Sequence, residues 1–299
     1  MKRDPSIHLS PVAVKTLDLK GLKVAIVGGT GGIGRALALS LAAQGAHVLV
    51  VGQTFRDAAT PGITFMRADL SLMKEAQRVA RELPAETLDI VIMTTGVMAG
   101  PKREVTGEAI ERDLAVSYLS RYVILKQIAP RLGTGRANPG TKPRVFVMGF
   151  PGSGQAGDVD DLNSERNYGR WKAHMNTVAG NEAIVLDARD RYPHIDAFGL
   201  NPGFVKTDIR ANLFGWKWLR GIVEALTSLM TLAPEVYAER IVPLLVSSDI
   251  GGHSGAMFNN KAEAILPSPG VVDPAHRSGL LAASDALIER VQGSPSTKK

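Results

Sequence analysis

The sequence predicts one α/β domain in which helices cover both faces of a doubly wound parallel sheet. From Leu22 onward, short β-rich apolar runs alternate with longer segments of helical periodicity. The first run also passes through a glycine-rich turn directly into a helix. Alternation of this kind is typical of βαβ units, whose crossover helices pack on a parallel sheet. The expected domain covers residues 18–292, between an arm at 1–17 and a flexible tail at 293–299.

Six apolar runs are the predicted strands: "KVAIV", "HVLVV", "ITFMR", "LDIVIM", "RVFVM" and "IDAFGL". A strand at 22–27 and a helix over about 32–44, with Gly45 as its stop, form the clearest pair. The two longest helices are predicted at 107–132 and 167–191. A loop rich in glycine and proline separates them.

Composition excludes several classes of protein. A chain of 299 residues, 44% apolar and 21% charged, can bury a large core. Without cysteine it forms no disulfide, cysteine-ligated zinc site or iron–sulfur cluster, and no metal site is predicted. No apolar stretch approaches the roughly 18 residues of a membrane-spanning helix, and the first residues lack the apolar region of a signal peptide. We therefore expect a cytoplasmic protein.

The formal net charge of +6 raises the question of a nucleic-acid partner. The basic residues are scattered along the chain and gather only at its two ends, where tails in solvent explain them. We expect no nucleic acid as a partner and no integral membrane segment.

The turn "GGTGGIG" follows the first strand and opens the first helix. Glycines let the backbone approach a pyrophosphate, whose charge meets free N–H groups and the positive end of the helix. Two registers fit: Gly29, Gly31 and Gly34, or Gly28, Gly32 and Gly34. A purely structural turn is the alternative. The sequence context predicts a dinucleotide site.

The end of the second strand bears on the identity of the dinucleotide. Gly52 and Gln53 stand where an acidic side chain would bind the adenosine ribose of NAD. Its absence removes repulsion against a 2′-phosphate, and Arg56 is close enough in sequence to pair with one. NADP is favoured over NAD, with a merely solvated Arg56 as the alternative. Asp69 is placed to accept from the adenine amino group or to cap a turn.

Tyr168 and Lys172 are four residues apart in the predicted helix 167–191, so one helix face would carry both. A nearby ammonium group lowers the pKa of a phenol and makes it a usable proton donor or acceptor. The pair therefore predicts acid–base chemistry beside the cofactor.

The order of these motifs resembles the short-chain dehydrogenase/reductase family over about residues 20–260. The glycine turn, Asp69-Leu70, Tyr168 with Lys172, and "NPGFVKT" follow one another as in that family. "TTGVM" and "DLNSE" resemble the branch of retinol dehydrogenases and protochlorophyllide reductases, and fungal enzymes of secondary metabolism also look similar. The resemblance implies a Rossmann domain with a seven-stranded parallel sheet, NADPH as cofactor, and a homodimer or homotetramer.

The resemblance also implies roles for individual residues. Tyr168 would move the proton, and Lys172 would hold the nicotinamide ribose and lower the tyrosine pKa, with Ser153 or Ser117 assisting. The implied cofactor contacts are Gly28, Thr30, Gly32, Ile33, Gly34, Gln53, Arg56, Asp69, Leu70, Thr95, Gly96, Tyr168, Lys172, Pro202, Gly203, Val205 and Thr207.

The departures from the family lie at the positions that would carry out the chemistry. "VIMTTG" replaces N-N-A-G, Ser117 stands for the helix asparagine, and Gly149 and Phe150 occupy the positions of the strand-five serines. Ser153 is one replacement, with a loop serine bonded to its own backbone as the alternative. Otherwise another residue or the substrate holds the oxygen, or the protein binds cofactor without carbonyl chemistry. Losing one such donor costs about 10²- to 10³-fold in rate, which weakens an enzyme without abolishing it.

The segment at about 208–232 is the implied helical substrate lid, and it is rich in apolar side chains that include Trp216 and Trp218. A water-excluded pocket for an apolar, even polycyclic, substrate follows. Core packing, a subunit interface and a peripheral membrane contact are the alternatives. The leading hypothesis is an NADP-dependent oxidoreductase acting on a small apolar carbonyl or alcohol. An NADP(H)-binding isomerase, lyase, sensor or scaffold of the same fold is the second.

Overall fold

The computed structural model describes residues 1–136, 140–203 and 232–293. One mixed sheet of eight strands forms its centre, in the order β3-β2-β1-β4-β5-β6-β7-β8. The strands are β1 (Lys23–Val27), β2 (His47–Gly52), β3 (Ile63–Arg67), β4 (Ile90–Met93), β5 (Arg144–Met148), β6 (Asp196–Leu200), β7 (Met257–Phe258) and β8 (Ala264–Ile265). Strands β1 to β7 pair in parallel, and β8 pairs antiparallel with β7. The sheet therefore has eight strands, of which the edge strand β8 is antiparallel, and not the seven parallel strands that were expected.

The central strands explain the parallel arrangement. All residues of β4, β5 and β6 are buried, and a strand buried on both faces needs helices on both sides of the sheet. Strand order reverses beside β1, which pairs with β2 on one side and β4 on the other. Val27, at the end of β1, lies level with Val51 and Met93. Ligands of doubly wound sheets bind at such a reversal, beyond the carboxyl ends of the strands.

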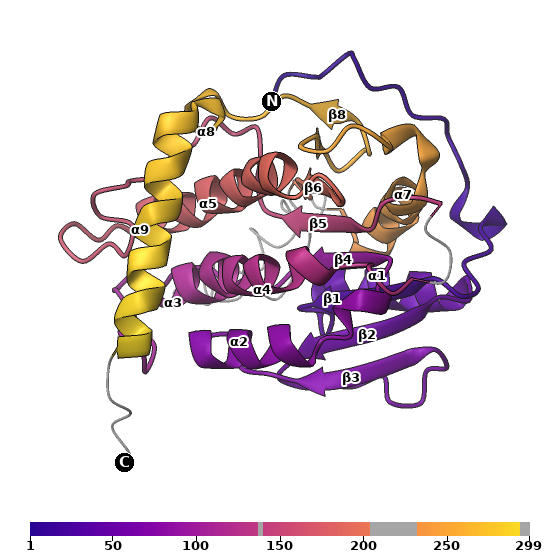
Figure 1. Cartoon of the computed structure of the whole chain (residues 1–299), viewed down its shortest axis with the longest axis horizontal. Helices are drawn as coiled ribbons and strands as arrows, with labels where there is room; N and C mark the ends of the chain where they lie inside the picture. Colours follow the sequence, from indigo (N-terminus) through magenta and orange to yellow (C-terminus); the bar gives the residue numbers. More distant parts are fainter. Residues whose placement is uncertain (137–139, 204–231, 294–299) are drawn as a thin grey trace, which may run out of the picture.

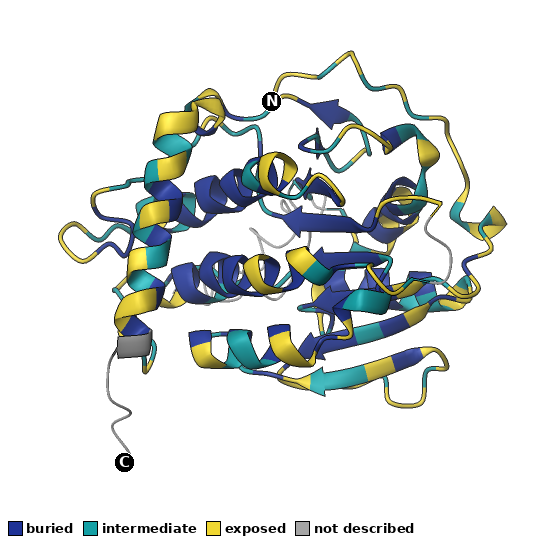
Figure 2. Cartoon of the chain, in the orientation of Figure 1, coloured by how far each residue is buried: buried dark blue, intermediate teal, exposed yellow. Residues whose placement is uncertain are grey.

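Helices form a layer on each face of the sheet (Figure 1). One layer holds α2 (Met73–Glu82), α4 (Ser120–Ile128) and α5 (Arg170–Arg191), and α9 (Pro274–Gly293) packs on α5. The other holds α1 (Gly32–Ala43) and α7 (Pro234–Val246), which contact each other. Short helical segments are η1 (Val14–Thr16), η2 (Ala85–Thr87), α3 (Arg112–Leu114), the π-helical η3 (Ala115–Leu119), η4 (Ala129–Arg131), η6 (Ser248–Ile250) and α8 (Pro269–Val272). Each layer has its own apolar core, and Figure 2 shows buried residues gathered where helices meet strands.

Two helix starts differ from the prediction. The helix expected from residue 107 begins at Arg112, because a bridge between Val105 and Glu111 closes a turn in which Ala109 has a φ of 58°. The helix expected from residue 167 begins at Arg170, after the extended residue Gly169. The strand predicted at 22–27 and the helix predicted at 32–44 agree with β1 and α1 within one residue. The lid at 208–232 lies outside the described residues except for its last position.

The N-terminal segment starts beside β8, at the edge of the sheet, and then passes around the right-hand side of the view in Figure 1 towards β1. Arg3 forms an antiparallel bridge with Ile265 in β8, and the Asp4 amide donates to the Ala264 carbonyl over 2.9 Å. Ser10 N donates to Asp249 Oδ2 over 2.7 Å. These contacts place the expected arm against β8 and the region that follows α7.

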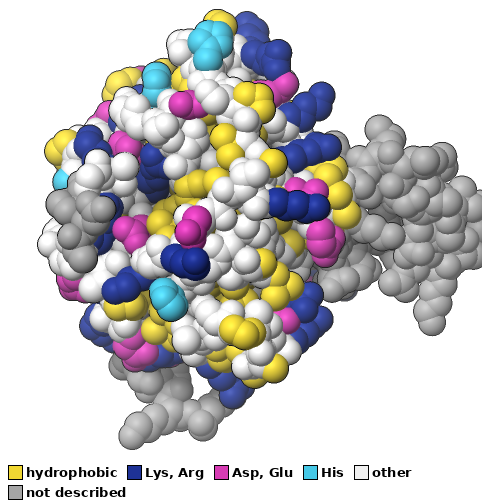
Figure 3. All heavy atoms as spheres, turned by 90° about the vertical axis from the view of Figure 1, so that its right-hand side faces the viewer, with side chains coloured by type: hydrophobic (Ala, Val, Ile, Leu, Met, Phe, Trp, Pro, Cys, Tyr) yellow, Lys and Arg dark blue, Asp and Glu magenta, His cyan; other side chains and the backbone are white. Residues whose placement is uncertain are grey.

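Charged side chains are distributed over the face shown in Figure 3, where basic and acidic residues alternate with apolar ones. This view shows no continuous basic surface among the described residues. Of the helices that the structure describes, none combines the length and the apolar composition needed to cross a membrane.

Candidate active site

The glycine turn packs directly against the segment that follows β4. Gly28 has a φ of 98°, and a Cβ atom there would collide with the backbone nitrogen of Thr95. A Cβ on Gly34 would collide with the carbonyl oxygen of Gly28 and with the hydroxyl of Thr94. Glycine at both positions therefore allows the first helix to approach the carboxyl end of β4 closely.

An open cradle lies beside this contact. Gly31 is the N-cap of α1 and no side chain caps the helix, so its first N–H groups lack a side-chain acceptor. A Cβ on Gly31 would meet no atom within 4 Å. The Thr95 hydroxyl is buried without a hydrogen-bond partner in the described part of the chain. Free N–H groups at a helix N-terminus and an unpartnered hydroxyl fit a dinucleotide pyrophosphate and its nicotinamide side.

Thr30 and Gln53 lie at the end of β2, beside the glycine turn. A Cβ on Gly52 would lie 2.6 Å from Thr30 Cγ2, so glycine at the end of β2 gives Thr30 its room. Gln53 Nε2 donates to Asp69 Oδ1 over 3.0 Å, and the Ser71 amide donates to the same oxygen. Asp69 thus connects the ends of β2 and β3, and a turn-capping role for it is observed.

Arg35 and Asp57 form a two-pronged ion pair near the same end of the sheet. Arg35 Nη2 lies 2.6 Å from Asp57 Oδ1, and Arg35 Nε lies 2.8 Å from Asp57 Oδ2. The guanidinium holds the pKa of Asp57 below its usual range. Arg56 is exposed to solvent. The charge of the Asp57 carboxylate is therefore already neutralised by Arg35.

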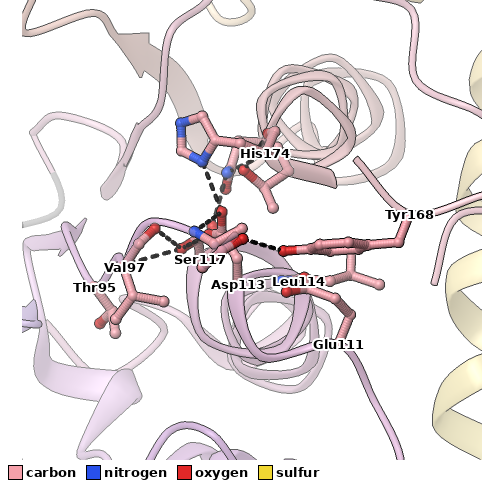
Figure 4. A network of polar contacts seen from close by, with 12 residues as sticks. Thr95, Val97, Glu111, Asp113, Leu114, Ser117, Tyr168 and His174 are labelled. Carbon is pink, nitrogen blue, oxygen red and sulfur yellow. Dashed lines mark hydrogen bonds and ion pairs between the residues drawn. The ribbon is translucent and has the colours of Figure 1, made fainter. Parts of the chain in front are cut away.

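Asp113 is the centre of a buried polar network that the sequence did not reveal (Figure 4). The Ser117 hydroxyl donates to Asp113 Oδ1 over 2.5 Å, and the Ala99 amide donates to Oδ2 over 3.1 Å. His174 Nδ1 lies 2.7 Å from Oδ2. Ser117 Oγ also accepts from the Val97 amide over 3.0 Å. The network therefore joins η3 and α5 to residues 97–99, which follow β4.

The prediction that one helix face carries Tyr168 and Lys172 is wrong, because Tyr168 precedes the first residue of α5. Lys172 Nζ lies 2.8 Å from Asp158 Oδ2. The Tyr168 hydroxyl donates to the Gly100 carbonyl over 2.6 Å.

Burial and three nearby carboxylates raise the pKa of Tyr168; the carboxylates belong to Glu111, Asp113 and Glu104. The expected lowering of this pKa by Lys172 is therefore not found in the structure. A phenol with a raised pKa stays protonated at neutral pH.

A buried guanidinium lies at the carboxyl ends of β4 and β5. Arg121 donates to the carbonyl oxygens of Thr95 and Met148, and its Nη1 lies 3.0 Å from Asn181 Oδ1. Burial lowers its pKa to about 9, which still leaves it charged at neutral pH. Asn181 also packs against Gly149, whose Cβ would lie 3.2 Å from Asn181 Cβ. Glycine at the first expected serine position thus fits the close packing of Asn181.

Ser153 lies in the loop after β5, and the next residue, Gly154, is hydrogen-bonded to Ser268. Its hydroxyl is buried and has no hydrogen-bond partner among the residues described. Glu182 accepts from the backbone and hydroxyl of Ser268, and the Ser268 hydroxyl accepts from the Gly154 amide over 3.0 Å. Burial raises the pKa of Glu182. The described residues thus include no hydrogen bond from the Ser153 hydroxyl to Tyr168 or Ser117.

The other residues predicted to contact the cofactor lie in both cores, beside Ser117 and after β6. Ile33 packs on the core of the α1 face, and Leu70 is buried in the core of the α2 face. A Cβ on Gly96 would lie 3.6 Å from both Ser117 Oγ and Arg121 Nη2. Pro202 and Gly203 follow β6, where the Gly203 amide donates to Asn201 Oδ1 over 2.9 Å. Val205 and Thr207 lie outside the described residues. No cluster of three metal-ligating side chains occurs within the described ranges.

Sequence reasoning missed Asp113, Arg121 and His174. Asp113 and Ser117 are four residues apart, a helical spacing that could have drawn attention to them. No sequence signal links either residue to His174. Arg121 resembles a solvated helix residue until its burial is known.

Comparisons with known proteins agree with this arrangement. A family model described as short chain dehydrogenase matches residues 23–140. An uncharacterized oxidoreductase of Saccharomyces cerevisiae is 47% identical over 294 residues, covering 97% of this chain and 95% of its own. A polyprenol dehydrogenase of Mus musculus is 28% identical, over 81% and 77% of the two chains. A Pseudomonas aeruginosa structure in complex with NADP has a TM-score of 0.60 and 20% identity, covering 81% of this chain and 95% of that one. The chain belongs to the short-chain dehydrogenase/reductase family of oxidoreductases.

Proposed function

We propose that the protein is an NADP(H)-dependent oxidoreductase that moves a hydride between the nicotinamide and a carbonyl or alcohol carbon of a small apolar substrate. The observation that carries the proposal is the contact of Gly28 with Thr95 beside the reversal of strand order. Next to it, α1 presents an uncapped N-terminus at Gly31, and the Thr95 hydroxyl lacks a partner among the described residues. A dinucleotide supplies acceptors for both.

Two features support NADP rather than NAD. Gly52 and Gln53 leave the end of β2 without a carboxylate, and Gln53 instead bonds Asp69. The carboxylate of Asp57 faces Arg35, so it does not repel a 2′-phosphate as a free acid would. The exposed guanidinium of Arg56 supplies a cation that can pair with that phosphate.

An apolar substrate is supported by Trp171, a residue that is 63% exposed on the first turn of α5. Its ring centroid lies 6.2 Å from that of His174. An exposed indole beside a polar network provides apolar surface where a substrate would meet the reacting groups. The mouse polyprenol dehydrogenase is a relative whose name denotes an apolar alcohol. Polycyclic carbonyl compounds of secondary metabolism are a second group within this class.

The chain's own residues perform binding and proton transfer in this proposal. When bound, NADP(H) supplies or accepts the hydride. The N-terminus of α1 binds the pyrophosphate, and Thr95 with Gly96 positions the nicotinamide end. Ser117 and Tyr168 border residues 97–100, where the substrate oxygen must be held. Ser153 is kept as an assisting hydroxyl because it lacks a partner within the described chain. Homodimer or homotetramer assembly and a cytoplasmic location stay predictions.

Binding of NADP(H) without redox turnover is the second candidate function. Gly149 and Phe150 stand in place of the expected serines, and Lys172 is paired with Asp158. The site therefore departs from the family's catalytic residues at the serine and in the surroundings of the lysine. An isomerase, lyase, sensor or scaffold would bind the cofactor without oxidising it.

The test uses Gly31, where a side chain fits without a clash. Gly31→Asp places a carboxylate where the pyrophosphate would bind, and Gly31→Ser adds a neutral side chain of similar size. We measure NADPH and NADH affinity by fluorescence and NADPH oxidation with a panel of aromatic and polycyclic ketones. We expect wild type and Gly31→Ser to bind and oxidise NADPH, and Gly31→Asp to lose at least about tenfold in affinity. Equal binding by all three proteins would contradict the cofactor site, and binding without oxidation would favour the second candidate.

A further inference from the structure

We propose that the buried guanidinium of Arg121 makes the cofactor site selective for the reduced nucleotide, NADPH, over its oxidised form, NADP⁺. The inference rests on the proposed binding of NADP(H) and adds a preference between its two redox states. The nicotinamide ring is neutral in NADPH and carries one positive charge in NADP⁺. A fixed cation close to the ring therefore disfavours only the oxidised form.

Arg121 lies where the nicotinamide end of the cofactor is expected. It belongs to the first turn of α4, and its guanidinium donates to the carbonyl oxygens of Thr95, just after β4, and Met148, at the end of β5. A Cβ on Gly96 would lie 3.6 Å from Arg121 Nη2. Thr95 and Gly96 are the residues proposed to position the nicotinamide. The positive charge of Arg121 therefore lies behind the segment that the ring would contact.

The guanidinium of Arg121 is held by neutral acceptors. Besides the two backbone carbonyls, it contacts Asn181 Oδ1, which lies 3.0 Å from Nη1, and its Nε makes no hydrogen bond to any residue that the structure describes. Arg121 is only 3% exposed, so water and salt screen its charge weakly. Burial lowers its pKa to about 9, which leaves it protonated at neutral pH. The site therefore contains a buried positive charge.

Asp113 is the acidic side chain whose charge acts on Arg121, and it acts without a hydrogen bond between them. Its carboxylate instead accepts from the Ser117 hydroxyl and the Ala99 amide and faces His174 Nδ1 (Figure 4). Asp113 therefore offsets part of the field of the guanidinium without forming an ion pair that would neutralise it.

Coulomb's law gives the size of the effect. Two unit charges about 12 Å apart, at an effective dielectric constant of about 20, change an equilibrium about tenfold. Burying a guanidinium costs free energy, and a neutral amide could donate to a backbone carbonyl at a lower cost of desolvation. A purely structural contact therefore does not require a charge at Arg121, whereas discrimination between the two redox states does.

The preference acts on binding and release of the nucleotide, not on the chemical step. The positive charge that Arg121 disfavours develops on the ring as the hydride leaves, so the guanidinium gives no advantage to hydride transfer itself. It favours NADPH when the two nucleotides compete for the free site, and it favours release of NADP⁺ after a carbonyl has been reduced. We therefore expect the protein to work in the direction of carbonyl reduction when both nucleotides are present.

The test compares Arg121→Gln with Arg144→Gln. Glutamine keeps an amide that can donate to a carbonyl, but it removes the charge. Arg144 is a buried arginine at the opposite end of β5, where it donates to the Leu245 carbonyl over 2.8 Å. The same substitution there controls for the loss of a buried guanidinium. Calorimetry measures the dissociation constants of NADPH, NADP⁺ and 2′-phospho-ADP-ribose, a fragment that lacks the nicotinamide ring.

We expect wild type and Arg144→Gln to bind NADPH at least about tenfold more tightly than NADP⁺, and Arg121→Gln to lose most of this ratio. The fragment should bind all three proteins alike, because it carries no ring charge. If Arg121→Gln weakens NADPH and NADP⁺ equally and keeps the wild-type ratio, Arg121 only holds the backbone and the inference is overturned.

The wild type alone provides a second measurement, which needs no variant to fold. NADPH should bind it more tightly than the fragment does, and NADP⁺ should bind no more tightly than the fragment, because the guanidinium repels the charged ring. Equal affinities for NADPH and NADP⁺ in the wild type would overturn this inference and leave the proposed function intact. A wild type that binds none of the three compounds would overturn the proposed function and this inference with it.

Discussion

Asp113 and His174 are 61 positions apart in the chain, yet the Asp113 carboxylate and the His174 ring meet at 2.7 Å between α3 and α5. The contact is buried on the Asp113 side and partly exposed on the His174 side. A fixed carboxylate of this kind holds an imidazole in one tautomer and stabilises its cation. Asp113 therefore fixes the orientation of the His174 ring.

Asp113→Asn should lower kcat by about 10²-fold while KM changes little, because the Asp113 carboxylate positions the Ser117 hydroxyl and the Ala99 amide next to the segment that Tyr168 contacts. The amide occupies the same space but cannot accept from all of these donors. Steady-state kinetics and NADPH titration test this, with thermal unfolding to confirm that the variant is folded. Asp285→Asn, at a more exposed ion pair with Lys126, is the control. A larger effect on KM than on kcat would indicate a role in substrate binding.

Arg56→Ala should weaken NADPH binding by roughly tenfold, about 1.4 kcal/mol, and leave NADH binding unchanged. The physical reason is that only NADPH carries the 2′-phosphate that an exposed guanidinium can pair with. Fluorescence titration with both nucleotides gives the two affinities. Arg67→Ala, at the exposed end of β3, is the matched control for loss of one surface charge. A parallel loss for both nucleotides would argue against a 2′-phosphate contact.

The strands were predictable because their side chains are buried on both faces, which requires continuous apolar runs such as "IVIM" and "RVFVM". The glycine turn was predictable for a similar reason, since Gly28 and Gly34 allow no side chain. The last strand was not predictable, because β8 contains two residues and is too short to show a pattern of apolar and polar side chains. It is defined by pairing with β7 and with Arg3, at opposite ends of the sequence.

The active site was only partly predictable. The spacing of Tyr168 and Lys172 fitted one helix face, but the helix begins after the tyrosine. The residues before it form a loop in which the amides of Glu165, Arg166 and Asn167 donate to the Asp161 carboxylate. Side-chain acceptors of this kind compete with helix formation, and their effect depends on geometry that spacing does not encode. The meeting of Asp113 with His174 requires the packing of two helices.

Trp171→Ala should raise KM for apolar ketones several-fold and leave kcat and the free energy of unfolding nearly unchanged. Because Trp171 is 63% exposed, removal of its indole costs the folded state little buried area but removes apolar surface close to His174. Kinetics with a short aliphatic ketone and a polycyclic ketone provide the comparison. Val272→Ala, at an exposed apolar side chain on α8, is the control. Equal KM values for both ketones in variant and wild type would place the apolar contact elsewhere.

Asp57→Asn should destabilise the protein at pH 7 and have no effect in acid. The bond to Arg35 holds the pKa of Asp57 below its usual range in the folded state, so the unfolded chain binds this proton more readily. The stabilisation by ionised Asp57 is therefore present above the ordinary aspartate pKa of about 3.9 and is lost as pH falls through the folded value. Arg35 is 40% exposed, which limits the effect to less than about 1 kcal/mol and makes it sensitive to salt.

Urea unfolding of wild type and Asp57→Asn between pH 7 and pH 3 measures the difference directly. We expect the two free energies of unfolding to converge on acidification and, at pH 7, to approach each other when salt is added. Asp285→Asn, whose ion pair is exposed on both sides, should show a smaller difference at every pH. A gap between wild type and Asp57→Asn that widens in acid would mean that Asp57 stabilises the fold through its hydrogen bonds as a neutral group. The Arg35 charge would then be free to meet a nucleotide phosphate at the N-terminal turn of α1.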